Sequence, residues 1–277
     1  MTMSQVDRTN ISECPHTGKI LKSANFLSPQ YGVSGEGVVY YLEASNPDYG
    51  PDYFLEEYQK QYGKNYQDDE TNLRRLASRR LKRISRFIRP RSRLLEIGTA
   101  TGFFLDEARN TGLEVEGVEI SDYAANLARD RLRLSVKTGS FIEMEFDGKY
   151  DIICAYYVLE HFRDQKALFE KISNLLNPGG FFSFACPSTN GPVYRTAPHL
   201  WMKEHPKDHF ADYSPASLKK IFPMYGMRLL ESYPASYHPE RIGKRSLWRI
   251  LGSFYPFFAD LFCYGDTMEG LAQKIGR

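Results

Sequence analysis

The amino-acid sequence predicts an α/β protein with a mostly parallel sheet, helices on both faces of that sheet and an N-terminal extension. From Arg93 onward, short apolar segments of strand length alternate with segments of helical periodicity, and the connections between them are short. A loop of small residues, Gly98–Gly102, follows the first strand, at the edge where such sheets bind ligands. The first 40 residues are rich in Gly, Ser and Pro and show no clear period, so we expect them to wrap the surface.

The strands and helices can be placed in order along the chain. We expect strands at residues 93–97, 113–120, 134–139, 150–157, 181–186, 226–233 and 267–275. We expect helices at residues 73–88, 102–110, 122–133 and 162–176. Ser121 or Asp122 should cap the third helix, and the turn from Asn177 to Gly180 should end the fourth, because such residues favour helix boundaries.

The bulk composition indicates a cytoplasmic protein. The 277 residues are 42% hydrophobic and 25% charged, and the net charge of +2 is too small to indicate a nucleic-acid partner by itself. The four cysteines lie far apart without a CxxC pair, which argues against a disulfide framework. The N-terminal residues do not resemble a signal peptide, and no apolar run reaches the ~20 residues that a membrane span needs.

One short segment resembles half of a zinc knuckle. The sequence ECPHTG, Glu13–Gly18, offers one thiol and one imidazole. Thr17 stands where the second thiolate would be, and no further cysteine pair completes a set of four ligands. We therefore predict no metal site.

A strongly basic segment precedes the first strand of the sheet. Residues 74–93 contain ten Lys or Arg and no acidic residue, and their apolar positions follow helical spacing. One interpretation is a patch that binds nucleic acid or phosphate. The interpretation that we favour is a solvated helix face balanced by the acidic, tyrosine-rich stretch at residues 43–70.

The small-residue loop excludes two common ligands. A nucleoside-triphosphate loop requires Gly-Lys-Ser/Thr, which does not follow here. A dinucleotide loop requires small residues at its first, third and sixth positions, but the sixth position counted from Gly98 is Phe103. A phenyl group there would obstruct the close packing of helix on strand, so NAD is disfavoured.

The spacing Glu96-x-Gly98-x-Ala100-x-Gly102 instead resembles the first motif of class I S-adenosylmethionine-dependent methyltransferases. Small residues let the backbone approach the cofactor, and the following helix directs its positive end toward the methionine carboxylate. The resemblance implies that Glu96 lies near the ammonium group and that Glu119 accepts both ribose hydroxyls. The implied cofactor contacts are Glu96, Gly98, Thr99, Ala100, Gly102, Glu119, Ile120, Ser140, Phe141 and Tyr156.

Three later segments carry a second, more specific resemblance. They are YDIICAYYVLEHFRD at residues 150–164, LLNPGGFFSFACPSTN at 175–190 and HLWMKEHPKDHFADYSPASLKKIF at 199–222. Their order is similar to that of the ubiquinone-biosynthesis-like small-molecule methyltransferases. The resemblance covers roughly residues 50–277 and implies a Rossmann-like class I fold with seven strands. The usual acid after the third strand is replaced by Ser140, whose hydroxyl, or the face of Phe141, would then contact the adenine.

If the acceptor is a hydroxyl, a base must remove its proton, and histidine suits that role near neutral pH. His161 follows the fourth strand, at the methyl end of the cofactor in this architecture, and His209 lies on the later loop that would cover the acceptor. His205 is close by, with Asp208 as an available orienting partner. Both candidate bases also allow a purely structural interpretation. The residues expected to contact substrate are Tyr58, Tyr62, Tyr157 and His205.

The domain layout follows from these segments. Residues 1–70 would form an extension that closes over cofactor or substrate, and residues 71–277 would form the methyltransferase domain. Within that domain, residues 241–264 are dense in aromatic and aliphatic side chains. We favour a packing element or dimer interface for them, the alternative being a contact with a membrane surface. A monomer or a homodimer is compatible with the sequence.

The function that the sequence favours is transfer of a methyl group to a small molecule, at a hydroxyl oxygen of a sugar, quinone or other secondary metabolite. A nucleic-acid methyltransferase that uses the basic 74–93 stripe is one alternative. It is less favoured because the Asn/Asp-Pro-Pro-aromatic signature is absent at Ala155–Val158. A non-catalytic scaffold with the same fold is the other alternative.

Overall fold

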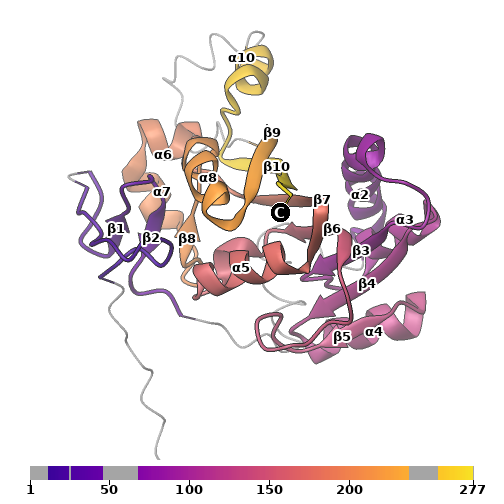
Figure 1. Cartoon of the computed structure of the whole chain (residues 1–277). Coiled ribbons are helices and arrows are strands. Elements are labelled where there is room, and N and C mark those ends of the chain that lie inside the picture. The colour runs from indigo at the N-terminus through magenta and orange to yellow at the C-terminus, as the bar shows by residue number, and fades with distance from the viewer. Residues whose placement is uncertain (1–11, 25, 46–67, 237–254, 277) are drawn as a thin grey trace, which may run out of the picture.

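A computed structural model describes residues 12–24, 26–45, 68–236 and 255–276 of the chain (Figure 1). Its central sheet has seven strands in the order β5-β4-β3-β6-β7-β10-β9. Neighbours from β5 to β7 are parallel, whereas β10 is antiparallel to both β7 and β9. The strands are β3 (Arg93–Ile97), β4 (Glu114–Glu119), β5 (Val136–Thr138), β6 (Tyr150–Tyr156), β7 (Leu176–Pro187), β9 (Met227–Ser236) and β10 (Thr267–Lys274). The predicted mostly parallel, seven-stranded sheet is confirmed.

Helices cover both faces of this sheet because consecutive strand residues point to opposite sides and both sides are apolar. Leu94 and Ile152 pack with α2 (Glu70–Ile84), α3 (Phe103–Asn110) and α4 (Asp122–Leu132). Their neighbours Leu95 and Ile153 belong to the other core, with α5 (Gln165–Leu175) and α8 (Pro215–Ile221). Each of these four strand residues is fully buried. The helices predicted in the basic segment and after β3 and β4 are therefore present, and the Ser121 hydroxyl caps α4 by accepting from the amide of Ala124.

The helix after β6 begins later than the sequence predicts. A short 3₁₀ helix, η3 (Leu159–His161), comes first, and Asp164 then caps α5 by accepting from the Ala167 amide at 2.9 Å. The expected turn at its end is also different, because β7 begins at Leu176 and includes the Pro-Gly-Gly sequence. Leu176 pairs with Tyr150 of β6, so a long-range strand pairing prevails over the local turn signal.

The N-terminal extension contains two strands that the sequence did not indicate. β1 (Tyr31–Val33) and β2 (Val39–Tyr41) form an antiparallel sheet with β8 (Ala211–Asp212). Each strand has at most three residues, which is too short for a periodic pattern to be recognised. With α6 (Pro192–Thr196) and α7 (Pro198–Glu204), this small sheet lies at the opposite end of the molecule from α2 and α3 (Figure 1).

The ECPHTG segment fastens the extension to the core. The Sγ of buried Cys14 lies 3.5 Å from the Tyr40 hydroxyl. The two ring nitrogens of His16 lie 2.8 and 3.1 Å from the hydroxyls of Tyr225 and Tyr213, and Tyr213 in turn donates to Gln165 at 2.7 Å. Burial lowers the pKa of His16 to about 4, so its imidazole is neutral at physiological pH.

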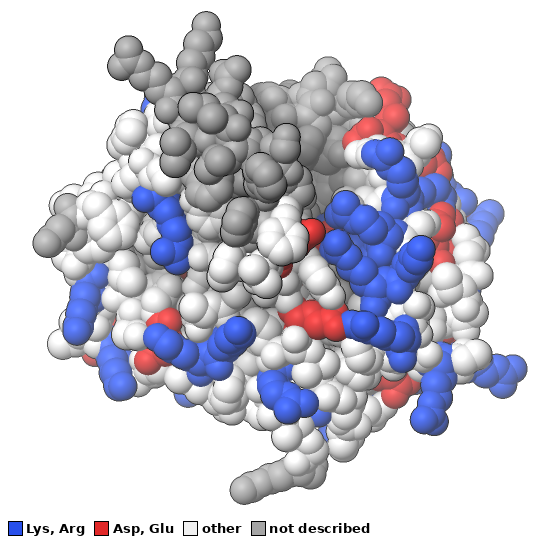
Figure 2. All heavy atoms as spheres, turned by 90° about the horizontal axis from the view of Figure 1, so that it is seen from above, with Lys and Arg blue, Asp and Glu red and all other residues white. Residues whose placement is uncertain are grey.

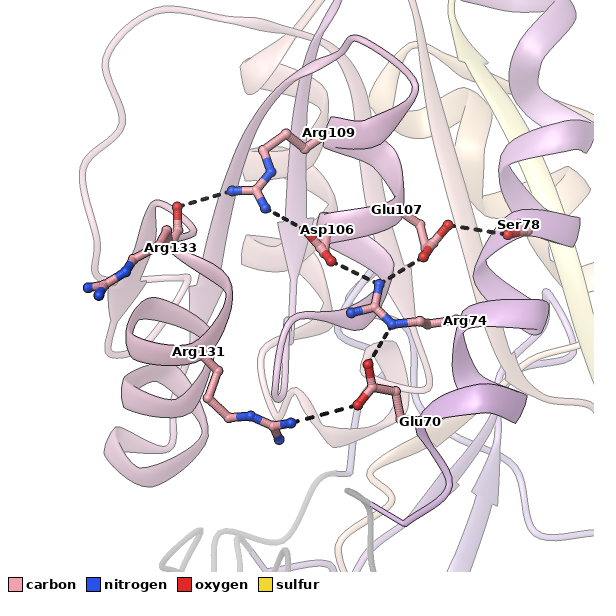
Figure 3. A network of polar contacts seen from close by, with 8 residues as sticks. All are labelled: Glu70, Arg74, Ser78, Asp106, Glu107, Arg109, Arg131 and Arg133. Atoms are coloured by element: carbon pink, nitrogen blue, oxygen red, sulfur yellow. Dashed lines mark hydrogen bonds and ion pairs between the residues drawn. The ribbon is translucent and has the colours of Figure 1, made fainter.

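The basic helix α2 uses its arginines within the fold. Arg74 contacts Glu70 of its own helix and Asp106 and Glu107 of α3 at 2.7–2.8 Å (Figure 3). The same network includes Arg109, which lies 2.5 Å from Asp106 and continues toward the C-terminal end of α4 (Figure 3). These contacts hold α2 against α3 rather than leaving a free cationic stripe.

A second set of ion pairs holds the other side of α2 to the sheet. Arg79, Arg80 and Arg83 all contact the carboxylate of Glu269 on β10, which is 5% exposed. Arg86, just beyond α2, contacts Glu231 on β9. In the view of Figure 2, the densest group of Lys and Arg atoms accordingly has acidic atoms beside it. Among the residues that the structure describes, the partners of the stripe are thus mainly on α3, β9 and β10, and Glu70 is the partner from the acidic stretch.

Among the described residues, no helix is both long enough and apolar enough to cross a membrane. Within residues 241–264, the part that the structure describes forms α10 (Tyr255–Phe262). Phe257, Leu261 and Phe262 on this helix are each more than 60% exposed.

Candidate active site

The loop between β3 and α3 has an unusual backbone. Gly98, Ala100 and Gly102 have φ angles of 71°, 48° and 91°, in the left-handed region. A Cβ at Gly98 would lie 2.4 Å from Val158, and one at Gly102 would lie 2.6 Å from Leu134. Both positions therefore require glycine, because any side chain there would collide with neighbouring side chains of the protein. The loop leads directly into the N-terminus of α3, whose first amides have no partner within the helix and suit an anionic group of a ligand.

Glu119 connects this loop to the end of β4. Its two carboxylate oxygens accept from the amides of Ala100 at 2.8 Å and of Ser121 at 2.9 Å. Burial raises the pKa of Glu119, and these amide hydrogen bonds oppose that rise. A carboxylate oxygen has more than one acceptor site, so both oxygens can still accept from a ribose diol. The structure thus fixes the orientation of Glu119 before any ligand binds.

Two buried polar atoms at the loop lack a protein partner, and they test whether the cofactor fits. These atoms are Oε2 of Glu96 and Oγ1 of Thr101, on residues that are both 4% exposed. Burial raises the pKa of Glu96 well above its usual value. An ammonium group would supply the donor that Glu96 lacks, so the residues present fit the methionine end of S-adenosylmethionine. Thr101 is not among the cofactor contacts predicted from the sequence, although its position inside the loop could have indicated it.

The remaining residues predicted to bind the cofactor differ in their contacts and in their exposure. Thr99 braces the loop, because its hydroxyl donates to the Glu96 carbonyl at 3.2 Å. Ile120 is 51% exposed, as a residue beside an adenine ring should be, and Ser140 is half-buried. Phe141 is 3% exposed, and its ring packs against Phe146 and Phe162 in the core.

Tyr156 and Tyr157 point in different directions at the end of β6. The Tyr156 hydroxyl lies 3.0 Å from Ser183, and its ring lies between Phe104 and the guanidinium of Arg80, in the layer between sheet and helices. Tyr157 is 38% exposed and has a φ of 59°. A left-handed conformation is costly for a tyrosine and is often found at functional sites. Tyr157 is thus the better placed of the two to contact a ligand.

His161 lies in η3, directly beyond β6, and is paired with Asp208. Its Nδ1 lies 3.0 Å from the Asp208 carboxylate and 3.2 Å from the Asp208 carbonyl. Burial lowers the pKa of His161, but the hydrogen bonds to Asp208 and the nearby negative charges of Glu160 and Asp208 together raise the pKa overall. Because Nδ1 donates to Asp208, Nε2 is the nitrogen with a free lone pair.

The expectation that Asp208 orients His205 was wrong. The Nε2 of His205 lies 2.7 Å from Asp212, and its side chain is only 2% exposed. The Tyr31, Tyr41 and Trp201 rings surround it, with ring centroids 4.6–5.4 Å away. The pairing depends on β8, which places Asp212 beside the extension and leaves Asp208 to His161.

His209 completes the cluster. Its ring packs edge-on against His161 with centroids 4.9 Å apart, and its Nδ1 lies 3.9 Å from Asp212 Oδ1. Burial lowers the pKa of His209, and the neighbouring histidines keep the pKa of Asp212 below its usual value. The amide of Phe210 donates to the Glu160 carbonyl at 2.6 Å, which ties this segment to η3. Tyr58 and Tyr62, the other candidate substrate residues, lie outside the described residues.

Comparison with known proteins identifies the family. Residues 70–232 match the model of a family described as methyltransferase domain. A ubiquinone biosynthesis O-methyltransferase of Thiobacillus denitrificans is 23% identical over 160 residues, which are 53% of this chain and 69% of that protein. An uncharacterized methyltransferase of Bacillus mycoides is 31% identical over 96 residues, 33% of this chain, and the chain spans less than half of its length (45%).

The fold of this chain is also similar to that of a solved structure. A chain in the complex between the Haloferax volcanii Trm112 methyltransferase activator and the putative methyltransferase superposes with a TM-score of 0.60 at 17% identity. The match covers 84% of this chain and all of that chain. The family model and the methyltransferase relatives confirm the predicted S-adenosylmethionine-dependent enzyme. The chain belongs to the methyltransferase domain family, as a class I methyltransferase with S-adenosylmethionine as its cofactor.

Proposed function

We propose that this chain transfers the methyl group of S-adenosylmethionine to a hydroxyl oxygen of a small molecule, such as a sugar, a quinone or another secondary metabolite. The observation that carries the proposal is the His161–Asp208 pair at the carboxyl end of β6, with 3.0 Å between Nδ1 and the carboxylate. A hydroxyl needs a base when it attacks an electrophilic methyl group, and this pair supplies one.

The sulfonium of the bound cofactor supplies the electrophilic methyl group, and the chain holds it in line with the acceptor. Glu119 would hold the ribose, Glu96 the ammonium group, and the amides at the start of α3 the carboxylate. His161 Nε2 would accept the hydroxyl proton while the acceptor oxygen bonds to the methyl carbon and the bond from that carbon to sulfur breaks. Asp208 would fix the imidazole and stabilise the imidazolium that results, as in other carboxylate–histidine pairs.

The names of the relatives support oxygen as the acceptor atom. The Thiobacillus protein, 23% identical over 160 residues, is an O-methyltransferase of ubiquinone biosynthesis. The ion pairs of Arg74, Arg80 and Arg83 weigh against the alternative of a nucleic-acid substrate, because these side chains are already engaged within the fold. We also propose a cytoplasmic location.

The proposal can be tested with labelled S-adenosylmethionine and a panel of hydroxyquinones, phenols and sugars, each beside its amine analogue. We expect label in an ether product. In His161→Gln, turnover should fall by roughly 10²–10⁴-fold with cofactor affinity kept, since a general base contributes about that factor. The exposed His199 provides the control, and His199→Gln should keep full turnover. Methylation of the amines alone would contradict the proposal, as would full turnover in His161→Gln.

A further inference from the structure

A buried cluster next to the proposed base has polar atoms without partners. Three imidazoles, of His161, His205 and His209, lie among the carboxyl groups of Glu160, Asp208 and Asp212. Four atoms of this cluster are buried and have no hydrogen-bond partner. They are Glu160 Oε2, His205 Nδ1, His209 Nδ1 and Asp212 Oδ1. Because a buried polar atom without a partner costs free energy, a bound ligand that contacts these atoms would stabilise the cluster.

Two of these atoms face each other. Asp212 Oδ1 and His209 Nδ1 are 3.9 Å apart, which is too long for a hydrogen bond, and the Asp212 side chain is 1% exposed. Two ligands on one tetrahedral ion with bonds of about 2.1 Å are roughly 3.4 Å apart. A closure of about half an ångström would therefore let both atoms bind the same cation.

We propose that His205, His209 and Asp212 form a binding site for a divalent transition-metal ion. One nitrogen or oxygen from each residue lies within 4.8 Å of the others, and the spacing His-x-x-x-His-x-x-Asp places them on one short segment. Two imidazoles and one carboxylate suit Zn²⁺, Fe²⁺ or Mn²⁺, whereas Mg²⁺ and Ca²⁺ prefer oxygen ligands alone. Three protein ligands leave one coordination position open.

An overlapping group, Glu160, His161 and His209, could also hold an ion, but it is less suitable. His161 is already engaged with Asp208, and three of the four unpartnered atoms belong to His205, His209 and Asp212. Within the described residues, Asp212 is also held in place from a second side, because β8 pairs it with Val39. A ligand on a strand is held more firmly than one on a loop.

The sequence motifs predicted no metal site, because they do not show that His205 and Asp212 lie together beside the small sheet at residues 31–41 and 211–212. The site lies beside His161, with 4.9 Å between its ring and that of His209. If the proposed function is correct, the open position can bind the acceptor oxygen and lower the pKa of its hydroxyl.

The test uses the purified full chain without a polyhistidine tag, stripped with a chelator and free of cofactor and acceptor. We expect Zn²⁺ to bind at one equivalent in calorimetry and, at about 100-fold excess over Kd, to raise Tm by about 5 °C. Co²⁺ should give the visible absorption of a low-coordinate site. Mg²⁺ at the same concentration should change neither Tm nor Zn²⁺ affinity.

Variants decide whether these residues bind the ion. His209→Gln and Asp212→Asn should each weaken Zn²⁺ affinity by at least about tenfold, the effect of losing one ligand. His199→Gln, which removes an exposed histidine of the same segment, should leave the affinity unchanged. Circular dichroism checks that each variant folds, and His209→Gln suffices if Asp212→Asn does not fold. No saturable Zn²⁺ binding by the folded chain, or unchanged affinity in a folded His209→Gln, would overturn the proposal. Because no methyl transfer is measured, either result is independent of the proposed function.

Discussion

At the scale of single residues, the site is built from buried polar groups that the backbone holds in place. Glu119 is fixed by two amides from the loop and from α4, and His161 is fixed by Asp208. The glycines next to Glu119 have equally specific surroundings, since a side chain at either Gly98 or Gly102 would collide with the core. Function and packing therefore depend on the same few positions.

Alanine variants of Gly102 and Gly112 distinguish the cost of backbone strain from the cost of a steric clash. Their φ angles are nearly equal, 91° and 88°, but a Cβ at Gly112 would meet no atom within 4 Å. Gly112→Ala should lower the free energy of unfolding by about 1–2 kcal/mol, the cost of a left-handed alanine. Gly102→Ala should lower it by a further 1–3 kcal/mol, roughly the cost of overpacking. Urea denaturation of both variants measures the difference, and equal losses would show that the contact with Leu134 is unimportant.

The lowered pKa of His16 should make the stability of the folded chain depend on pH. Its pKa is lowered to about 4 by burial, so the folded state binds fewer protons than the unfolded state below the ordinary value of 6.5. Its contribution to stability is therefore complete above pH 6.5 and is lost as the pH falls toward 4. The loss should amount to about 3 kcal/mol.

The matched variant is His16→Gln, which can keep hydrogen bonds to Tyr213 and Tyr225 but does not titrate. Unfolding free energies of both proteins should be compared across this pH range. The advantage of the wild type should shrink as the pH falls. A difference that stays constant with pH would contradict the assignment of His16 as a buried neutral imidazole.

At the scale of elements, α2 is held to the rest of the fold by charge as well as by its apolar face. Glu269 receives three arginines of α2, and Arg74 connects the helix to α3. Since β10 is antiparallel to β7, this contact secures the strand that closes the parallel part of the sheet. The basic segment thus acts as a structural connection between sheet and helices.

Glu269→Gln should destabilise the chain by roughly 3 kcal/mol, because it leaves Arg80, which is only 8% exposed, without its counter-charge. Glu170→Gln provides the control. Its pair with Lys166 is 3.9 Å long and more than half exposed, so the change should cost at most about 0.5 kcal/mol. Denaturation in guanidinium would mask the charges, so urea is the suitable denaturant. Equal effects of the two variants would contradict this role of Glu269.

At the scale of the whole molecule, sequence patterns predict the structural features that depend on residues close together in the sequence. Apolar strands joined by short connections predict the sheet, and the spacing from Glu96 to Gly102 predicts the cofactor loop. The pairings of His161 with Asp208 and of His205 with Asp212 span 47 and 7 residues and depend on β8, which has no local pattern. For the same reason the partner of the basic helix could not be predicted, because Glu269 lies 189 residues beyond Arg80. Long-range pairing leaves no periodic signal in a single sequence.

The measurement that tests the central claim most directly is calorimetric titration of S-adenosylhomocysteine and S-adenosylmethionine into the purified chain. NAD serves as the ligand control and Glu119→Ala as the protein control. We predict micromolar binding of both methyl-transfer ligands, no signal with NAD, and at least tenfold weaker binding in Glu119→Ala, since each lost hydrogen bond to a charged group costs about 1.5–3 kcal/mol. No binding by the folded wild type, or wild-type affinity in Glu119→Ala, would contradict the account.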